Sequence, residues 1–320
     1  MKVKFWGVRG SIPAPFSPDY YKSKVKEILL LALKKDLSND EKINDFINEL
    51  PIRLRTTYGG NTSCVTITTE EISIILDAGT GLRLLGKEIE EGKFINPTND
   101  EYYLFLSHLH WDHINGLPFF APLHSGNKKI NFYSVHKNYQ QILSDQQNAH
   151  FFPVSLESRP AEKEFHLLQE EKEILVGDLK IVPKKLDHPN DSYAFKVTDK
   201  NGFIVIYATD GEYRVGSDIN SLVEFYKDAD ILIFDSQYSS DELIEKTGFG
   251  HSSSEIGIDI AVRSNVKKII FFHHNHDHND KMIEDNLYRS IKYLEKNHPN
   301  NKLKIATANE NSEYQANLDL

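Results

Sequence analysis

The sequence predicts an α/β protein in which strands alternate with helices and one helical segment is inserted early. Three observations support this class. Residues 102–106 form an unbroken apolar run of strand length, which is typical of a strand covered on both faces. Helical segments recur between strand-like runs, most clearly at residues 254–263 and 280–297. Residues 20–50 interleave charges with apolar residues at helical spacing before Pro51, which indicates two inserted helices.

The expected strands follow one another along the whole chain. Glu70 and Glu71 separate two of them, so we expect a hairpin there, and Asp280 is the expected N-cap of the last helix. Because the chain contains no internal repeat or flexible linker, we expect a single domain, residues 1–320, with a helical insertion at about residues 20–50. The insertion is interpreted either as a surface hairpin or as a cover over the active site. In order, strands are expected at residues 3–8, 64–69, 72–76, 102–106, 129–135, 180–184, 193–198, 203–209, 230–235, 267–272 and 303–308.

Composition and charge narrow the class of protein. The formal net charge, 37 minus 47 or −10, argues against a surface built to hold a long polyanion, but not against a small phosphorylated substrate. The single cysteine, Cys64, excludes an intrachain disulfide framework and a multi-thiolate zinc site, and we expect it in the core or a loop. The longest apolar stretch, residues 28–33, is too short to span a bilayer, and the N-terminus reads as a strand. We therefore expect a cytoplasmic protein without a membrane partner.

A cluster of potential metal ligands follows directly after the apolar run at residues 102–106. Packing explains such a cluster poorly, because histidine and aspartate gain little from burial unless a partner compensates them. In an extended segment, alternation places the first two ligands on one side, and the other two can serve a second ion nearby. Nitrogen and oxygen ligands without sulfur suit Zn, Mn or Fe. The four residues are His108, His110, Asp112 and His113.

Further ligands are expected at the ends of later strands. His188 lies between two expected strands, and Asp210 ends an apolar one; a loop histidine and a turn residue before Gly211 are the simpler alternatives. His273 ends the expected strand at residues 267–272, and alternation alone does not choose between it and the neighbouring His274.

The pattern His-x-His-x-Asp-His resembles the signature of the metallo-beta-lactamase superfamily. Residues 5–13, 58–63 and 77–81, together with His274, resemble a bacterial subgroup of RNase Z-like and cyclic-nucleotide phosphodiesterase-like hydrolases. This resemblance implies a four-layer αββα sandwich and two divalent metal ions, Zn²⁺ first, with Mn²⁺ or Fe²⁺ as alternatives. It implies that one ion is held by His108, His110 and His188, the other by Asp112, His113 and His273, and that Asp210 and a hydroxide bridge them.

A proton donor is expected outside the histidine cluster. Ser252 and Glu255 have the spacing of a capping box, which would hold His251 on a fixed turn before a helix. The segment resembles the His-Ser-Thr motif of the RNase Z branch, whose histidine is thought to protonate the leaving oxygen. Asp235 matches the acidic residue that orients this histidine, although it is one methylene shorter than the glutamate of that branch. We count His251, Asp235 and Asp112 as the catalytic residues; an ordinary loop histidine and turn aspartate are the alternatives for the first two.

The resemblance implies that the protein hydrolyses a 3',5'-cyclic nucleotide to the monophosphate. The alternative is an RNA 3'-processing endonuclease, against which the acidic charge and the lack of a basic, glycine-rich extension count. A noncatalytic metal-bearing sensor is a third hypothesis. The expected partner is a small phosphodiester, with RNA second, and a homodimer is compatible with the sequence. Weaker candidates for substrate contacts are Arg9, Arg55, Arg214, Tyr58, Asn61 and Phe119.

Overall fold

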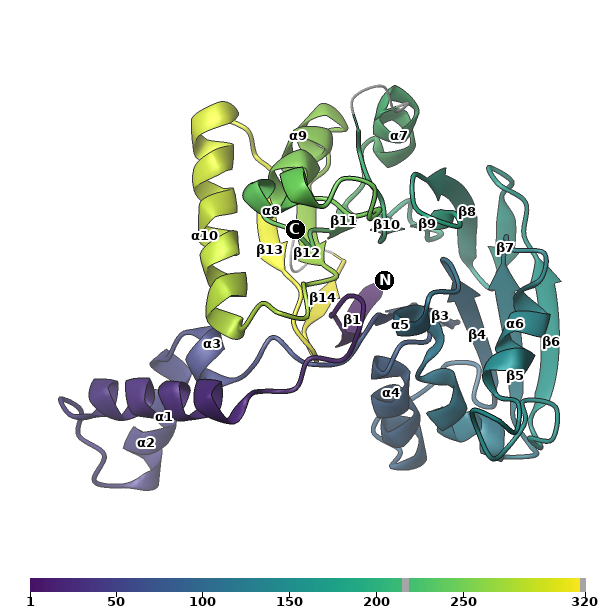
Figure 1. The fold of residues 1–320 in the computed structure, drawn as a ribbon, viewed down its shortest axis with the longest axis horizontal. Helices are drawn as coiled ribbons and strands as arrows, with labels where there is room; N and C mark the ends of the chain where they lie inside the picture. The colour runs from purple at the N-terminus through teal and green to yellow at the C-terminus, as the bar shows by residue number, and fades with distance from the viewer. Residues whose placement is uncertain (215–218, 317–320) are drawn as a thin grey trace.

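The computed structural model describes residues 1–214 and 219–316, and within them two mixed seven-stranded sheets form the centre of the fold (Figure 1). The first sheet has the order β14 (Glu313–Gln315), β1 (Lys2–Gly7), β2 (Cys64–Thr68), β3 (Ser73–Leu76), β4 (Glu101–Leu106), β5 (Lys129–Ser134) and β6 (Glu162–Leu167). The second has the order β13 (Lys304–Thr307), β12 (Lys268–Phe272), β11 (Ile231–Asp235), β10 (Ile204–Ala208), β9 (Ser192–Thr198), β8 (Leu179–Leu186) and β7 (Ile174–Val176).

Each sheet is antiparallel at one side and parallel at the other. Strands β14 to β3 pair antiparallel and β3 to β6 pair parallel. In the second sheet β10 to β13 are parallel and β7 to β10 are antiparallel. The carboxyl ends of parallel strands meet at one edge, so the loops after β10, β11 and β12 are brought together there. This edge carries the residues considered below.

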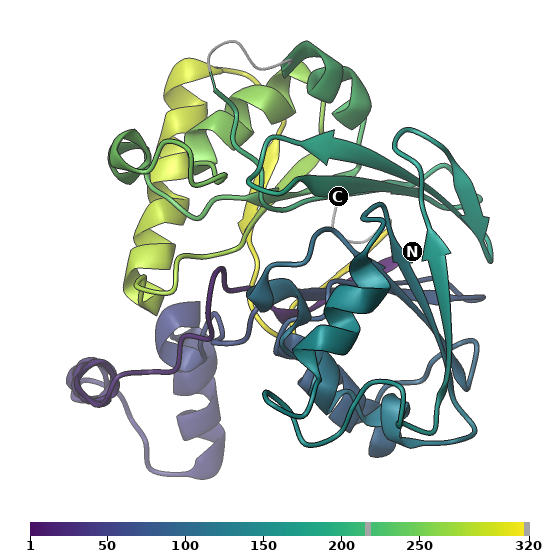
Figure 2. The same ribbon diagram turned by 45° about the vertical axis from the view of Figure 1, so that its right-hand side comes forward.

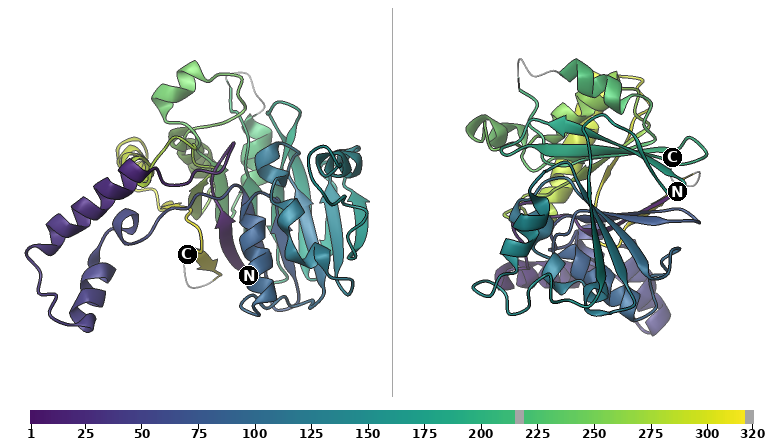
Figure 3. Two further views of the ribbon diagram at one scale, coloured as in Figure 1. Left: turned by 60° about the horizontal axis from the view of Figure 1, so that its bottom comes forward. Right: turned by 90° about the vertical axis from the view of Figure 1, so that its right-hand side faces the viewer.

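Apolar side chains fill three layers and explain why the sheets stack. In the central layer Phe105 and Phe5 from the first sheet pack against Phe195 and Phe272 from the second. Helices cover the two outer faces, as the right panel of Figure 3 shows. The predicted four-layer αββα sandwich is therefore confirmed. The covering helices are α4 (Gly81–Glu90), η1 (Leu117–Phe119), η2 (Ala121–His124) and α6 (Tyr139–Gln146) on one side, and α7 (Ile219–Tyr226), α9 (Ser254–Arg263) and α10 (Asp280–Asn297) on the other.

The predicted insertion consists of α1 (Pro18–Ala32) and α2 (Asp40–Glu49), followed by the short α3 (Ile52–Arg55). It has a small apolar cluster of its own, around Phe46, Leu50 and Leu54. Buried Lys24 donates to Asp280 at 3.2 Å and thereby ties α1 to the start of α10. In Figure 2 these helices project beside α10, away from the stacked sheets. Of the two interpretations offered by the sequence, the surface hairpin is the one that this arrangement favours.

Two helix caps differ from the prediction. Helix α10 is capped by Asn279, whose side chain accepts from the backbone of Met282, and Asp280 is the first helical residue. The carboxylate of Asp280 turns inward instead and accepts from Lys24, from the hydroxyl of Thr57 and from the backbone N–H of Tyr58. Helix α9 is capped by Ser253 and not by Ser252, so the predicted capping box is wrong; in a run of three serines, sequence spacing does not fix which one begins the helix.

Three strands were not predicted, namely β6, β7 and β14. The predicted hairpin of β2 and β3 is confirmed.

Among the described residues, no helix combines the length and the apolar character needed to cross a membrane. Two shorter helices, α5 (Trp111–Ile114) and α8 (Ser240–Glu245), lie in the loops at the edge where the parallel strands end.

Candidate metal centre

The first group of ligand-type side chains comprises His108, His110 and His188. The chain leaves β4 and delivers His108 and His110 before α5 begins, while His188 comes from the loop after β8. Nε2 of His108 and Nε2 of His188 each lie 3.0 Å from Nδ1 of His110. The three ring nitrogens thus converge on one point, as the ligands of a single ion do.

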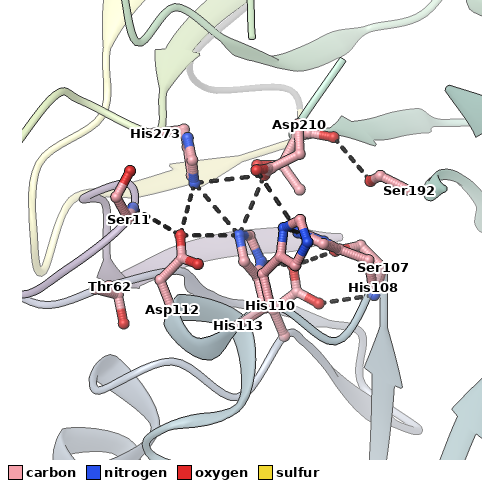
Figure 4. Close-up of polar contacts among 12 residues, drawn as sticks. Ser11, Thr62, Ser107, His108, His110, Asp112, His113, Ser192, Asp210 and His273 are labelled. Atoms are coloured by element: carbon pink, nitrogen blue, oxygen red, sulfur yellow. Dashed lines mark hydrogen bonds and ion pairs between the residues drawn. The ribbon is translucent and has the colours of Figure 1, made fainter. Parts of the chain in front are cut away.

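The second group comprises Asp112, His113, Asp210 and His273 (Figure 4). Oδ2 of Asp112 lies 3.0 Å from Nε2 of His273 and 3.2 Å from Nε2 of His113. All four side chains are buried. The structure therefore brings together, from four separate loops, every ligand expected from the sequence.

Asp210 lies between the two groups. Its Oδ2 is 3.2 Å from Nε2 of His113, and its Oδ1 is 3.7 Å from Nε2 of His108 and 3.8 Å from Nε2 of His188. One carboxylate oxygen faces each group. This is the placement that a residue shared by two ions would need.

The choice between the two adjacent histidines follows from their hydrogen bonds. His273 points into the second group, whereas Nε2 of His274 bonds to the backbone oxygen of Ala308 at 2.9 Å. Burial, aided by the nearby Arg9, lowers the pKa of His274 to about 3. His274 is therefore a neutral structural residue, and its backbone also joins the segment after β12 to the loop after β1.

Left-handed backbone conformations after strands β10 and β12 orient the side chains of two of these ligands. Asp210 and His273 have φ angles of 55° and 60°, which few residues other than glycine adopt. Such conformations persist where surrounding structure holds them, and they concentrate at functional sites. Gly250 has a φ of 84°, and any Cβ there would collide with the ring of His188. The backbone oxygen of Gly250 in turn accepts from Nδ1 of His188 at 2.8 Å, which directs Nε2 toward the cluster.

Asp77 supports the candidate metal centre through hydrogen bonds to the residues around it. It was not singled out from the sequence as a site residue. Its carboxylate accepts from the backbone and the hydroxyl of Ser107, both at 2.8 Å, from Tyr207 at 2.8 Å and from Nδ1 of His113 at 2.7 Å. The bond to His113 fixes that ring with Nε2 toward the second group. The only sequence signal was an aspartate at the end of an apolar strand before a glycine-rich turn, a pattern that Asp210 shares.

The charge states of the cluster suit a cation. Burial lowers the pKa of His108, His110 and His188, which keeps these rings in the neutral form that binds metals. Burial opposes ionisation of Asp112 as well, but the neighbouring His113 outweighs it and holds the pKa of this carboxyl well below its usual range. In the second group the carboxylates of Asp112 and Asp210 outweigh burial and raise the pKa of His113 well above its usual range and the pKa of His273 to about 9, so in the metal-free protein these two rings carry the positive charge that a bound ion would replace. Ionised carboxylates beside these ring nitrogens fit divalent metal binding, because the ion takes the place of the protons.

His251 and Asp235 form a pair beside the two groups. Nδ1 of His251 lies 2.8 Å from Oδ2 of Asp235 and 3.7 Å from Oδ1 of Asp210. Asp235 is held in turn by the backbone N–H of Gln237 at 2.9 Å. With Nδ1 engaged, Nε2 is the nitrogen left for a ligand or substrate.

A pocket of about 450 Å³ opens over the cluster. It exposes the indole of Trp111, which is 80% accessible, next to His110. None of the lining residues comes from the inserted helices. Its lining residues are Ser11, Leu109, His110, Trp111, Asp112, Asp210 and His251.

The weaker candidates for substrate contact lie elsewhere or are already engaged. Arg9 is 2% exposed and donates to the backbone oxygens of Gly59, Asn275 and His278, so it is a structural residue and not a substrate contact. Arg214 is exposed but pairs with Asp187 at 2.8 Å. Of the others, Arg55 donates to a backbone oxygen within the insertion, Asn61 bonds to Glu310, Tyr58 is buried, and Phe119 is exposed outside the pocket lining. Cys64 is fully buried in the core, as expected.

Comparison with known proteins decides the family. Residues 73–274 match the family described as "Beta-lactamase superfamily domain". This protein belongs to that superfamily. Over 283 residues, which cover 73% of this chain and 86% of the relative, it is 24% identical to ribonuclease Z of Picrophilus torridus.

Solved structures of other proteins share the fold. The metallo-beta-lactamase fold protein YhfI of Bacillus subtilis superposes with a TM-score of 0.64 at 19% identity, with 98% of each chain covered. Unliganded yeast PDE1 superposes with a TM-score of 0.60 at 15% identity, again with 98% of each chain covered. At these identities the likeness concerns the fold, and the function must be argued from the site.

Proposed function

We propose that this superfamily member is a metal-dependent phosphodiesterase that hydrolyses a 3',5'-cyclic nucleotide to the nucleoside monophosphate. The observation that carries the proposal is the position of His251, backed by Asp235, beside two adjoining groups of metal-ligand side chains. Hydrolysis of a phosphodiester requires an activated water, neutralised phosphate charge and a proton for the leaving oxygen. The site has candidate groups for all three requirements.

Each residue of the cluster has a proposed role. Two divalent ions, with Zn²⁺ the first choice, would activate water at neutral pH and neutralise charge on the phosphate oxygens when bound here. Asp77 and the oxygen of Gly250 orient the rings of His113 and His188 toward the ions. One ion would be held by His108, His110 and His188 and the other by Asp112, His113 and His273, and Asp210, which faces both groups, would serve both.

His251 is proposed to protonate the departing 3' oxygen. Its Nδ1 is held by Asp235, so its Nε2 carries the proton that can be transferred. The carboxylate of Asp235 stabilises the protonated ring before the transfer and keeps it aimed at the leaving group. After protonation the ribose 3' oxygen departs as a hydroxyl, and the phosphate remains on the 5' oxygen.

The pocket favours a small substrate. None of the described residues that line it is a lysine or an arginine, so positive charge for the phosphate would come from bound ions and not from side chains. Trp111 offers an exposed aromatic surface at the edge of the pocket on which a base could stack. The net charge of −10 also disfavours a long polyanion.

Cleavage of precursor RNA at its 3' side is the second candidate. It is supported by the ribonuclease Z from Picrophilus torridus, which aligns with 73% of this chain. The same residues would act in the same roles, and the insertion would contact the RNA. A noncatalytic sensor is the third candidate, and the pair formed by His251 and Asp235 argues against it.

A substrate panel at fixed metal content tests the proposal. It comprises cyclic AMP, cyclic GMP, cyclic dinucleotides, bis(p-nitrophenyl) phosphate and precursor tRNA. Faster cleavage of the cyclic mononucleotides than of precursor tRNA is expected. Faster cleavage of precursor tRNA would establish the second candidate instead, and inertness toward every diester with Zn, Mn and Fe would favour the sensor.

A further inference from the structure

The backbone of Ser11 has a conformation that serine rarely adopts. It lies in the loop after β1 with a φ of 68°, in the region that suits glycine. Its backbone N–H donates to Oδ2 of Asp112 at 2.7 Å, as Figure 4 shows. A glycine at position 11 would keep the hydrogen bond to Asp112 and would adopt this φ angle without strain. The bond to Asp112 therefore does not explain why this residue is a serine. A strained residue beside a reactive cluster points to a function of its side chain.

Gln237 fixes the direction of that hydroxyl. Its Nε2 donates to Oγ of Ser11 at 3.0 Å, and its own backbone N–H is anchored on Asp235. Because Oγ of Ser11 accepts from Gln237, its own proton is free to donate elsewhere. Gln237 is only 1% exposed, and among the described residues its Oε1 has no hydrogen-bond partner, so the bond from Nε2 to Ser11 is the side-chain hydrogen bond that orients this amide.

Ser11 is one of the residues that line the pocket, so its hydroxyl can donate to a ligand bound there. Asp112, Asp210 and His251 line the same pocket. The described residues that line the pocket include no lysine or arginine, so the lining has few donors for the oxygens of a phosphate. A neutral hydroxyl, oriented in advance by a buried amide, can bind an anionic oxygen without adding a charge that repels the ions.

We propose that Ser11, positioned by Gln237, is a binding site for a non-bridging oxygen of the phosphoryl group in both substrate and product. This inference rests on the proposed phosphodiesterase function, whose site it completes. Ser11 makes its contact in the ground state and in the transition state alike. Its loss therefore weakens binding and leaves the chemical step largely intact.

The decisive variant is Ser11→Gly, which removes the hydroxyl and suits the backbone. We expect KM for the cleaved diester, and the inhibition constant of inorganic phosphate, to rise about tenfold together, with little change in kcat. Metal content and thermal stability should not fall, because the N–H to Asp112 remains. Ser11→Asn, which tolerates positive φ and carries a donor, should recover part of the loss.

A second variant tests the positioning by Gln237. In Gln237→Glu the carboxylate accepts the proton of Ser11, so affinity for phosphate should fall as in Ser11→Gly, and the double variant should be no worse than either. Unchanged phosphate affinity in both single variants would overturn the inference. Loss of bound metal in Ser11→Gly would also overturn it, since Ser11 would then be a support for Asp112.

The inference and the proposed function can fail separately. Calorimetric titration of the metal-loaded protein with inorganic phosphate needs no turnover. Weaker phosphate binding in Ser11→Gly would support the subsite even if no diester on the panel were cleaved. Cleavage by the unmodified protein, with identical KM and phosphate binding in the variant, would remove the subsite and leave the function standing.

Discussion

Nδ1 of His251 lies 2.8 Å from Oδ2 of Asp235, at the boundary of the two ligand groups. If this pair supplies the proton for the leaving oxygen, His251→Ala should lower kcat about 10²- to 10⁴-fold on a diester with a poor leaving group. Bound metal, measured by elemental analysis, should be unchanged. His276→Ala is the matched control, because His276 is a half-buried histidine outside the cluster.

The leaving group provides an internal check on that prediction. p-Nitrophenolate needs no proton to depart, so bis(p-nitrophenyl) phosphate should be cleaved by the His251→Ala variant with a much smaller loss. Because His251 and Asp235 also lie within ligand distance of Asp210 and His273, they could instead hold an ion. Loss of metal from His251→Ala would show that they do.

Asp77→Asn should weaken metal binding although Asp77 does not face the ions. Its carboxylate accepts four hydrogen bonds, one of which orients His113. The amide NH₂ of asparagine would meet donors, so we expect metal affinity to fall about 10- to 100-fold and stability of the metal-free protein to fall by about 3 kcal/mol. Chelator competition and denaturant titration measure the two effects.

Asp199→Asn separates these two effects. Asp199 is a buried aspartate that accepts from the backbone of Asn201 and Phe203 at the far end of β9 and β10. The Asp199→Asn substitution should lower the stability of the protein without changing its metal affinity. Equal metal affinity in Asp77→Asn and the unmodified protein would mean that His113 needs no such orientation.

The fold and the cluster were largely predictable because strands covered on both faces are continuous apolar runs. Strands β4, β10, β11 and β12 have this character, and each ends in a ligand or catalytic candidate. A polar side chain at the end of such a strand is conspicuous. The strands that escaped prediction lack the signal: β6 is an edge strand of sequence EKEFHL with mostly half-exposed residues, and β14 is three residues long.

Contacts between distant loops were not predictable from local pattern. Nothing in the sequence around Gln237 indicates that it reaches Ser11, and Arg9 resembles a phosphate ligand until its backbone acceptors are seen. His273 and His274 follow the same strand, and what distinguishes them is the contact of His273 with Asp112 and the hydrogen bond of His274 to Ala308. In each case the deciding partner is remote in sequence, so periodicity contains no information about it.

Cys64 should be unreactive in the folded protein. It is buried in β2, and burial, aided by the nearby Asp77, raises the pKa of its thiol well above the usual value. At about pH 8, where a free thiol is partly ionised, this one stays protonated and shielded. We expect no reaction with a disulfide reagent until guanidinium chloride unfolds the chain, when one thiol per chain should react. Prompt reaction under native conditions would contradict this burial.

Replacing residues 17–56 with a short glycine-serine loop should leave the centre intact. The chain enters and leaves the insertion at adjacent points, since the N–H of Ala14 donates to the oxygen of Gly60 at 2.9 Å. Asp280 would lose Lys24 but keep the N–H of Tyr58, so we expect a loss of roughly 3 kcal/mol in denaturant titration. Asp280→Asn in the shortened chain should recover part of it.

The shortened chain also separates the two candidate substrates. No residue of the insertion lines the pocket, so metal content and turnover of a cyclic nucleotide should be retained. If the insertion instead grips RNA, cleavage of precursor tRNA should fall while cleavage of small diesters persists. Lys24→Met in the full-length protein is the control, because it breaks the same ion pair and keeps the outer surface of the helices. Loss of bound metal in the shortened chain alone would contradict the surface-hairpin interpretation and make the insertion part of the site.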